Sequence, residues 1–151
     1  MANNCRTEIH LHANQSTIDW FEKLVKDFTV EDYIGQFGDP NAELLIDKIG
    51  SKWLTKYDWG RYDDTEYFLS FESAWYPPDT MIKNMVAQLQ EHDKGAYATG
   101  RYWDEAFSPI GIFQCNAPDM WESAEADVDI DWDEEYYWDE QVEPAFDKLE
   151  L

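Results

Sequence analysis

Four aspartates near the C-terminal end have the spacing with the most specific chemistry in this sequence. They occupy alternate positions in Asp127-Val128-Asp129-Ile130-Asp131-Trp132-Asp133. In a β-strand, alternate side chains point to one face and repeat about every 6.8 Å, so the carboxylates would form one row with the apolar side chains behind it. Such a row on a fixed scaffold can imitate a line of phosphates. The simpler interpretation is a solvated edge strand whose charges prevent pairing with other chains.

The next segment mixes acids with large aromatic residues, in Glu134-Glu135-Tyr136-Tyr137-Trp138-Asp139-Glu140. Tyr and Trp are enriched in the residues that dominate protein interfaces, and three adjacent aromatics cannot all face one core from one element. One interpretation is therefore a binding epitope. The other is a C-terminal helix that packs Tyr137, Val142, Phe146 and Leu149 onto the domain, and both can hold together. The predicted partner-binding surface comprises Asp127, Asp129, Asp131, Trp132, Asp133, Glu134, Glu135, Tyr136, Tyr137, Trp138, Asp139 and Glu140.

Metal binding is a competing interpretation of the same acids. A calcium loop takes ligands from its positions 1, 3, 5 and 12, which would here be Asp129, Asp131, Asp133 and Glu140. Position 6 of such a loop needs the sharp turn of glycine, but Glu134 stands there. His10 and His12 lie on one face of a predicted strand, and the sequence places no third ligand near them. We therefore expect no metal site.

Catalytic motifs are missing from the sequence. There is no phosphate-binding loop, no G-x-S-x-G, no H-E-x-x-H and no Cys-His-Asn arrangement. A carboxylate pair could support acid–base hydrolysis, but pairs arise by chance at this density of acids. A small hydrolase is the least favoured of three interpretations, and we expect neither an enzyme nor a cofactor.

The charge balance restricts the partners of the protein. Thirty-three acids against eleven Lys and Arg give a net charge of −22 over 151 residues. A chain this acidic repels nucleic acid and anionic membranes and attracts basic surfaces, including surfaces built to hold nucleic acid. No stretch approaches the ~20 apolar residues of a membrane span. Cys5 and Cys115 fit buried thiols, and the N-terminus lacks the apolar run of a signal peptide, so we expect a cytoplasmic protein.

Periodicity predicts the elements that must position these groups. Residues 5–12, 52–59, 66–73, 96–103 and 110–115 predict strands, with a turn over 60–64. Residues 17–28, capped by Ser16, and 79–91 predict amphipathic helices, and 42–49 a short one. Trp75 is expected to anchor the core. The order corresponds to an α+β fold with a ferredoxin-like split βαβ antiparallel sheet and two covering helices.

The composition changes at Asn116-Ala117-Pro118. From Asp119 onward, fourteen acids stand against one base, Lys148, for a net charge of −13. We therefore expect a domain over residues 1–118 and an acidic, aromatic-rich C-terminal extension over 119–151.

Three motifs resemble the YubB-like family of phages and plasmids, whose members have a ferredoxin-like domain. They are Met1-Ala2-Asn3-Asn4-Cys5 before an alternating strand, Gly50-Ser51-Lys52-Trp53, and Phe71-Glu72-Ser73-Ala74-Trp75-Tyr76-Pro77-Pro78 before a helix. The resemblance covers residues 1–115, with Tyr76 where the family has serine and Asn4 where tryptophan is common. It implies a fold and a mobile-element origin, but no chemistry.

These features favour a phage-type accessory protein that binds and inhibits a host protein with a basic groove or pore. The target would be a nucleic-acid-binding or defence enzyme, held by DNA mimicry, or an ATP-dependent protease or similar machine. The alternative is a structural or assembly module whose acidity only confers solubility. The protein itself should bind neither nucleic acid nor membrane, and the sequence does not indicate its oligomeric state.

Overall fold

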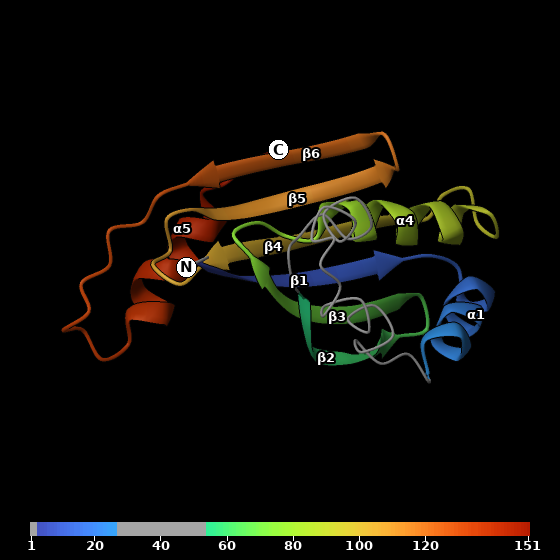
Figure 1. Cartoon of the computed structure of the whole chain (residues 1–151), viewed down its shortest axis with the longest axis horizontal. Coiled ribbons are helices and arrows are strands. Elements are labelled where there is room, and N and C mark those ends of the chain that lie inside the picture. Colours follow the sequence, from blue (N-terminus) through green and yellow to red (C-terminus); the bar gives the residue numbers. More distant parts are fainter. Residues whose placement is uncertain (1–2, 27–53) are drawn as a thin grey trace, which may run out of the picture.

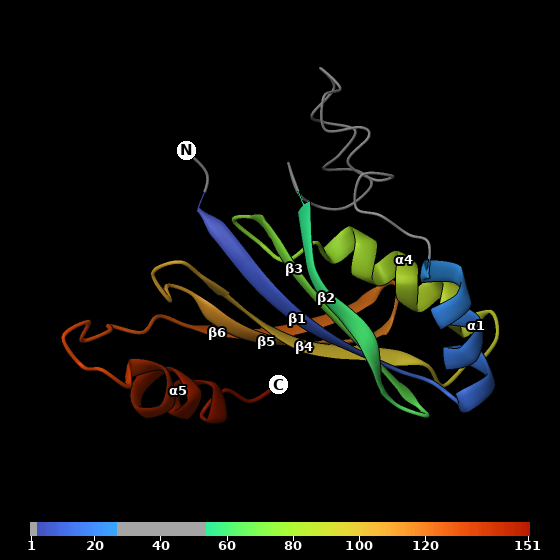
Figure 2. The same ribbon diagram turned by 90° about the horizontal axis from the view of Figure 1, so that it is seen from below.

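Six antiparallel strands form one twisted sheet in the computed structural model, which describes residues 3–26 and 54–151 (Figure 1). The strands are β1 (Asn4–His12), β2 (Leu54–Asp63), β3 (Glu66–Ala74), β4 (Tyr97–Asp104), β5 (Ile110–Ala117) and β6 (Met120–Ala126). The helices are α1 (Gln15–Val25), α4 (Asp79–Gln90), the π-helical turn η1 (Trp138–Val142) and α5 (Glu143–Asp147). Helices α1 and α4 lie on one face of the sheet and α5 on the other (Figure 2).

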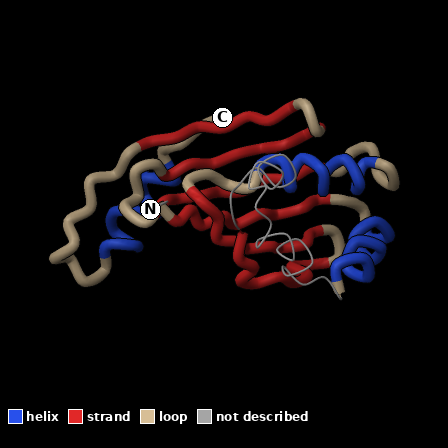
Figure 3. Tube along the Cα trace, in the orientation of Figure 1, coloured by secondary structure: helices blue, strands red, loops and turns tan. Residues whose placement is uncertain are grey.

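The expected fold class is wrong. In place of a ferredoxin-like βαβ sheet with two covering helices, the protein has a mostly β structure with strand order β2-β3-β1-β4-β5-β6. Strand dominates the coloured trace of the chain (Figure 3). The predicted boundary after residue 118 falls in the turn between β5 and β6, and the residues beyond it supply the edge strand and the C-terminal helix.

Apolar side chains on both faces of β4 and β5 explain why these additional elements form. On the α4 side, Phe113 of β5 stacks on Trp121 of β6, with ring centroids 4.7 Å apart and planes 8° apart. On the opposite side, Trp103 and Ile112 are covered by the C-terminal helix. Since burying a large apolar side chain contributes about 1.5–3 kcal/mol, the acidic segment folds against the sheet despite its charge.

The alternation predicted for the first strand is confirmed. Thr7, Ile9 and Leu11 are fully buried beneath α1 and α4, whereas His10 and His12 point to the other face and are only half-buried. Register fixes this pattern, because a slip of one residue would move every core side chain into water. The main core therefore lies between the sheet and α1 and α4, with Phe21, Phe71 and Phe113 among its largest side chains.

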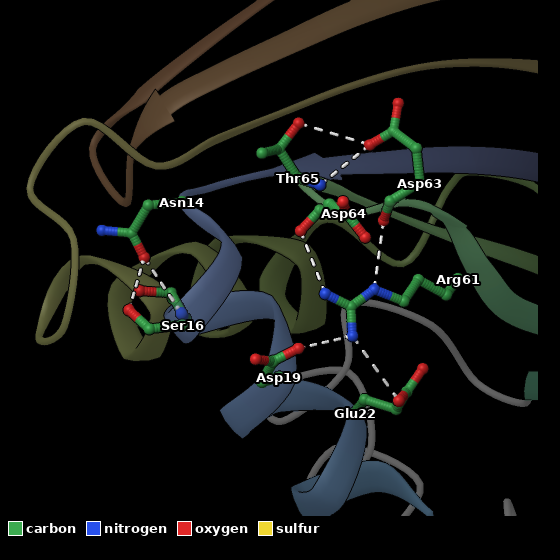
Figure 4. A network of polar contacts seen from close by, with 9 residues as sticks. Asn14, Ser16, Asp19, Glu22, Arg61, Asp63, Asp64 and Thr65 are labelled. Carbon is green, nitrogen blue, oxygen red and sulfur yellow. Dashed lines mark hydrogen bonds and ion pairs between the residues drawn. The ribbon is translucent and has the colours of Figure 1, made fainter.

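Helix α1 begins two residues earlier than the Ser16 cap predicts, at Gln15. Asn14 is the N-cap, since its side-chain oxygen accepts a hydrogen bond from the Thr17 N–H at 3.0 Å. The Ser16 hydroxyl donates to the same oxygen (Figure 4). The Asn14 cap satisfies an amide that the first turn leaves without a partner.

Arg61 joins β2 to α1 (Figure 4). Its guanidinium lies 2.6 Å from Asp19 and 3.6 Å from Glu22 on the helix, and it donates to the carbonyls of Asp63 and Asp64. These contacts fix the position of the β2–β3 turn beside the helix.

Two further predictions, the turn over residues 60–64 and the core position of Trp75, are corrected by the structure. Residue 60 is inside β2, and the turn follows at residues 64–65 rather than 60–64. Trp75 is not a core anchor, because 43% of its surface is exposed and its φ of 63° turns the chain away from β3. The short helix expected over 42–49 lies outside the described residues. Within residues 3–26 and 54–151, no helix has the length and apolarity to span a bilayer.

Both cysteine thiols should resist alkylation in the folded protein. Cys5 is 1% exposed and Cys115 0%, and burial raises the pKa of the Cys5 thiol to about 12. Burial also raises the pKa of Cys115. Because the thiolate is the nucleophile, iodoacetamide at pH 8 should label neither residue in native protein and both in guanidinium. Mass spectrometry gives the count, and rapid native labelling of either thiol would contradict the buried positions.

Candidate functional site

A second hydrophobic cluster holds the C-terminal segment on the sheet face opposite α1 and α4. Val142 is fully buried and Phe146 is 6% exposed, and both pack with Ile130, Phe107 and Ile110. The Phe146 and Trp103 rings meet edge to face with centroids 6.0 Å apart. The helix predicted to pack onto the domain is therefore present, and it positions the acids that precede it.

Arg101 of β4 connects this helix to the middle of the sheet. Its Nε donates to Glu8 at 2.7 Å, and its Nη1 donates to both oxygens of Glu143 at 3.0 Å. The Trp138 indole N–H donates to the same Glu143 at 3.0 Å. A partly buried arginine between two carboxylates forms charge-assisted bonds, which are stronger than neutral ones. Sequence reasoning missed this network because its members lie 42 and 93 residues apart.

The aspartate row is present in part, but not as a strand. Residues 127–131 lie outside any strand, although burial alternates as predicted, with Asp127, Asp129 and Asp131 exposed and Ile130 buried. The row ends at Asp131, because the chain turns there. The Asp131 side chain accepts a hydrogen bond from the Asp133 N–H at 3.1 Å, and the Asp131 carbonyl accepts one from the Glu134 N–H at 3.2 Å.

The aromatic residues divide between the cluster and the solvent. Tyr137 and Trp138 pack on Phe107, with ring centroids 6.1 and 5.7 Å away. Trp132 was expected behind the row, but it is 57% exposed, and Tyr136 is 60% exposed. The Trp132 ring still contacts Tyr137 at 5.2 Å. Two large aromatic rings are therefore exposed to solvent beside the packed cluster.

The exposed acids continue from the edge strand into this segment. Glu134 is half-buried and accepts a bond from Gln141 at 2.6 Å. The Ser108 hydroxyl donates to Asp127 at 2.8 Å. Exposed carboxylates occur from the β5–β6 turn to η1 at Asp119, Glu122, Glu125, Asp127, Asp129, Asp131, Asp133, Glu135, Asp139 and Glu140. The predicted partner-binding residues therefore form one continuous stretch of mostly exposed acids with two exposed rings, and their binding role stays a prediction.

The histidines predicted to lie on one strand face share a carboxylate. Glu66 of β3 lies 2.8 Å from His10 Nδ1 and 3.2 Å from His12 Nδ1. His12 Nε2 is 3.0 Å from the Thr99 hydroxyl, and its ring stacks on Tyr97 at 4.5 Å. Among the residues that the structure describes, no three His, Cys, Asp or Glu side chains are arranged to hold a metal ion.

Acidification should destabilise the protein through His12. Burial lowers the pKa of His12 below the ordinary 6.5, and His10 adds to the effect, while Glu66 and Asp63 oppose it. The folded state therefore binds this proton more weakly than the unfolded state. The contribution to stability is complete above pH 6.5 and is lost as the pH falls through the lower folded value.

The test is an NMR titration together with urea unfolding of wild type and His12→Gln between pH 7.5 and 5. We expect a His12 midpoint below 6.5 and a wild-type advantage that shrinks with acid. A titration midpoint of His12 above 6.5 would contradict this prediction.

No family model matches the chain, and no curated protein or solved structure shows significant similarity to it. The resemblance to the YubB-like family therefore stays an expectation.

Proposed function

We propose that this protein binds and blocks a basic, nucleic-acid-binding host protein by presenting carboxylates where that protein expects phosphates. The observation that supports the proposal best is the stretch of mostly exposed acids from Asp127 to Glu140, which also carries the exposed rings of Trp132 and Tyr136. Phosphate contacts dominate the affinity of nucleic-acid-binding proteins, so a line of carboxylates can occupy the same basic groove.

The anchoring of this stretch supports mimicry over simple acidity. A solubilising tail needs no fixed structure, whereas residues 128, 130, 137 and 138 pack into the second cluster beside β4 and β5. Arg101 and Glu143 hold the following helix to the sheet. A scaffold that fixes the carboxylates in advance lowers the ordering cost of binding.

A competition experiment tests the proposal. The protein is immobilised and exposed to host lysate at physiological salt, and retained proteins are identified by mass spectrometry. Duplex DNA is then added in excess. Since carboxylates and phosphates would compete for one groove, we expect DNA to release the main partner and micromolar protein to inhibit that partner's binding to DNA.

The outcomes separate the alternatives. A partner that survives excess DNA but is lost at high salt would point to a basic pore or groove of another kind, such as that of a protease. Retention of no specific partner at any salt would contradict the proposal and favour a structural module. A variant with Asp129, Asp131 and Asp133 changed to asparagine is the immobilised control. It lacks three of the proposed contact carboxylates and should retain less of the partner.

A further inference from the structure

A cavity of about 260 Å³ lies on the α4 side of the sheet, away from the C-terminal helix. It opens between the start of α4 and the edge strand β6. Its walls include Tyr76, Asp79, Tyr102, Trp121 and Glu125. Three aromatic side chains and two carboxylates thus meet at one opening.

The walls of this cavity are held in place. The Trp121 ring stacks on Phe113, and the Tyr102 hydroxyl donates to Glu125 at 2.5 Å. The backbone of Tyr76 is fixed by a bond from its N–H to the Ala74 carbonyl at 2.7 Å, and its carbonyl accepts the Ser73 hydroxyl at 2.6 Å. The Tyr76 side chain nevertheless stays 62% exposed, so it is displayed rather than packed.

The charge of the cavity is negative. Asp79 and Glu125 stand against Lys83, whose Nζ lies 3.7 Å from Asp79 and 5.8 Å from the centre of the Trp121 ring. The position of Lys83 indicates that a cation is favoured beside this ring. Among the described residues, Lys83 supplies one positive charge beside the two carboxylates, which leaves the charge of Glu125 without a neutralising cation at this opening.

Elsewhere the chain surrounds its own arginines with the same groups. The Arg6 guanidinium lies 3.8 Å from the centre of the Tyr57 ring, and Glu72 accepts the Tyr57 hydroxyl at 2.7 Å. Arg101 lies 4.9 Å from the Phe146 ring and pairs with two glutamates. Planar guanidinium stacks on aromatic rings and pairs with carboxylates better than ammonium does.

From this juxtaposition we propose that the cavity binds the guanidinium group of an arginine side chain from a basic partner. The guanidinium stacks between Tyr76 and Trp121 and pairs with Glu125. The proposal rests on the proposed function for the source of the arginine, and it adds a specific pocket, on a different face, to the acidic stretch.

The test titrates the whole protein with N-acetyl-arginine amide and follows the Trp121 indole N–H by NMR. We expect saturable shifts confined to the cavity, with a dissociation constant in the millimolar range. Glu125→Gln keeps an oxygen for the Tyr102 hydroxyl but removes the charge, so binding should weaken at least about fivefold. N-acetyl-lysine amide should bind more weakly than the arginine compound.

Glu122→Gln is the matched control, because residue 122 is on the same strand and faces the other side, paired with Gln114. It removes the same charge and should leave binding unchanged. Equal weakening by both variants would show general attraction to an acidic protein and overturn the proposal, as would unsaturable shifts or equal affinity for lysine. The arginine compound is a small molecule, so its binding does not depend on the partner. Saturable binding of this compound together with a failed DNA competition experiment would contradict the proposed function and leave the arginine pocket in place.

Discussion

Replacing Asp129, Asp131 and Asp133 with asparagine should slow association with the proposed basic partner about tenfold at low salt, since charge steering raises association rates by about 10–10³. The three side chains are exposed on one short stretch, and asparagine preserves their size. The effect should shrink as salt rises, because screening shortens electrostatic reach to about 8 Å at 0.15 M. Stopped-flow or surface-binding kinetics with the partner captured in the competition experiment measures both rates.

The matched control removes the same charge from the other side of the sheet. Asp58, Asp64 and Glu91 are exposed acids near β2 and the end of α4, and β2 and β6 are opposite edges of the sheet. Changing them to the corresponding amides should alter association by less than about twofold, as expected for surface charges distant from the contact. Equal slowing by both triple variants would show that only net charge matters, and would contradict a specific acidic surface.

The exposed aromatic rings of the same surface should affect the dissociation rate constant. Trp132 rests on Tyr137 with more than half of its surface in water. If it is buried on binding, Trp132→Ala should speed dissociation by about tenfold or more with little change in association, because contacts formed late act mainly on the off-rate. A variant that changed only association would argue against an anchoring role.

Hydrophobic periodicity and turn-forming residues predicted the individual strands and helices well. Alternating residues predicted β1 and β3, and apolar spacing predicted α1 and α4, because local propensity and the position of the core agree there. The order of the strands in the sheet and the packing of the C-terminal elements could not be predicted from these patterns. Composition identified residues 119–151 as acidic and aromatic-rich, but it did not indicate that Trp121 stacks on Phe113 or that Phe146 packs on Trp103.

The candidate site was predictable only where neighbouring residues create it. The exposure of Asp127, Asp129 and Asp131 followed from alternation. The turn at Asp131 depends on a side-chain hydrogen bond that no periodicity reveals. Glu66 joins His10 and His12 only because β3 pairs with β1. The Arg101 contacts and the cavity beside Tyr76 likewise bring together residues that are distant in the sequence.

Phe146→Ala should lower the free energy of unfolding of the region around the second cluster by about 3 kcal/mol, near the lower end for truncating a buried phenylalanine. Phe146 is 6% exposed and contacts Trp103 and Arg101. Helix α5 has five residues, and helices this short depend on packing. Hydrogen exchange should therefore accelerate in η1 and α5 while β1 and β3 remain protected.

The matched control is Leu151→Ala, because Leu151 is 55% exposed and its truncation should change stability by less than about 0.5 kcal/mol. The decisive readout is partner binding. Phe146→Ala leaves every charge in place but releases the carboxylates from their fixed positions, so a mimic that depends on geometry should bind at least about tenfold more weakly through the added ordering cost. If this variant lost the protection of α5 and still bound the partner as wild type does, charge alone would be sufficient, and phosphate mimicry by carboxylates in fixed positions would be wrong.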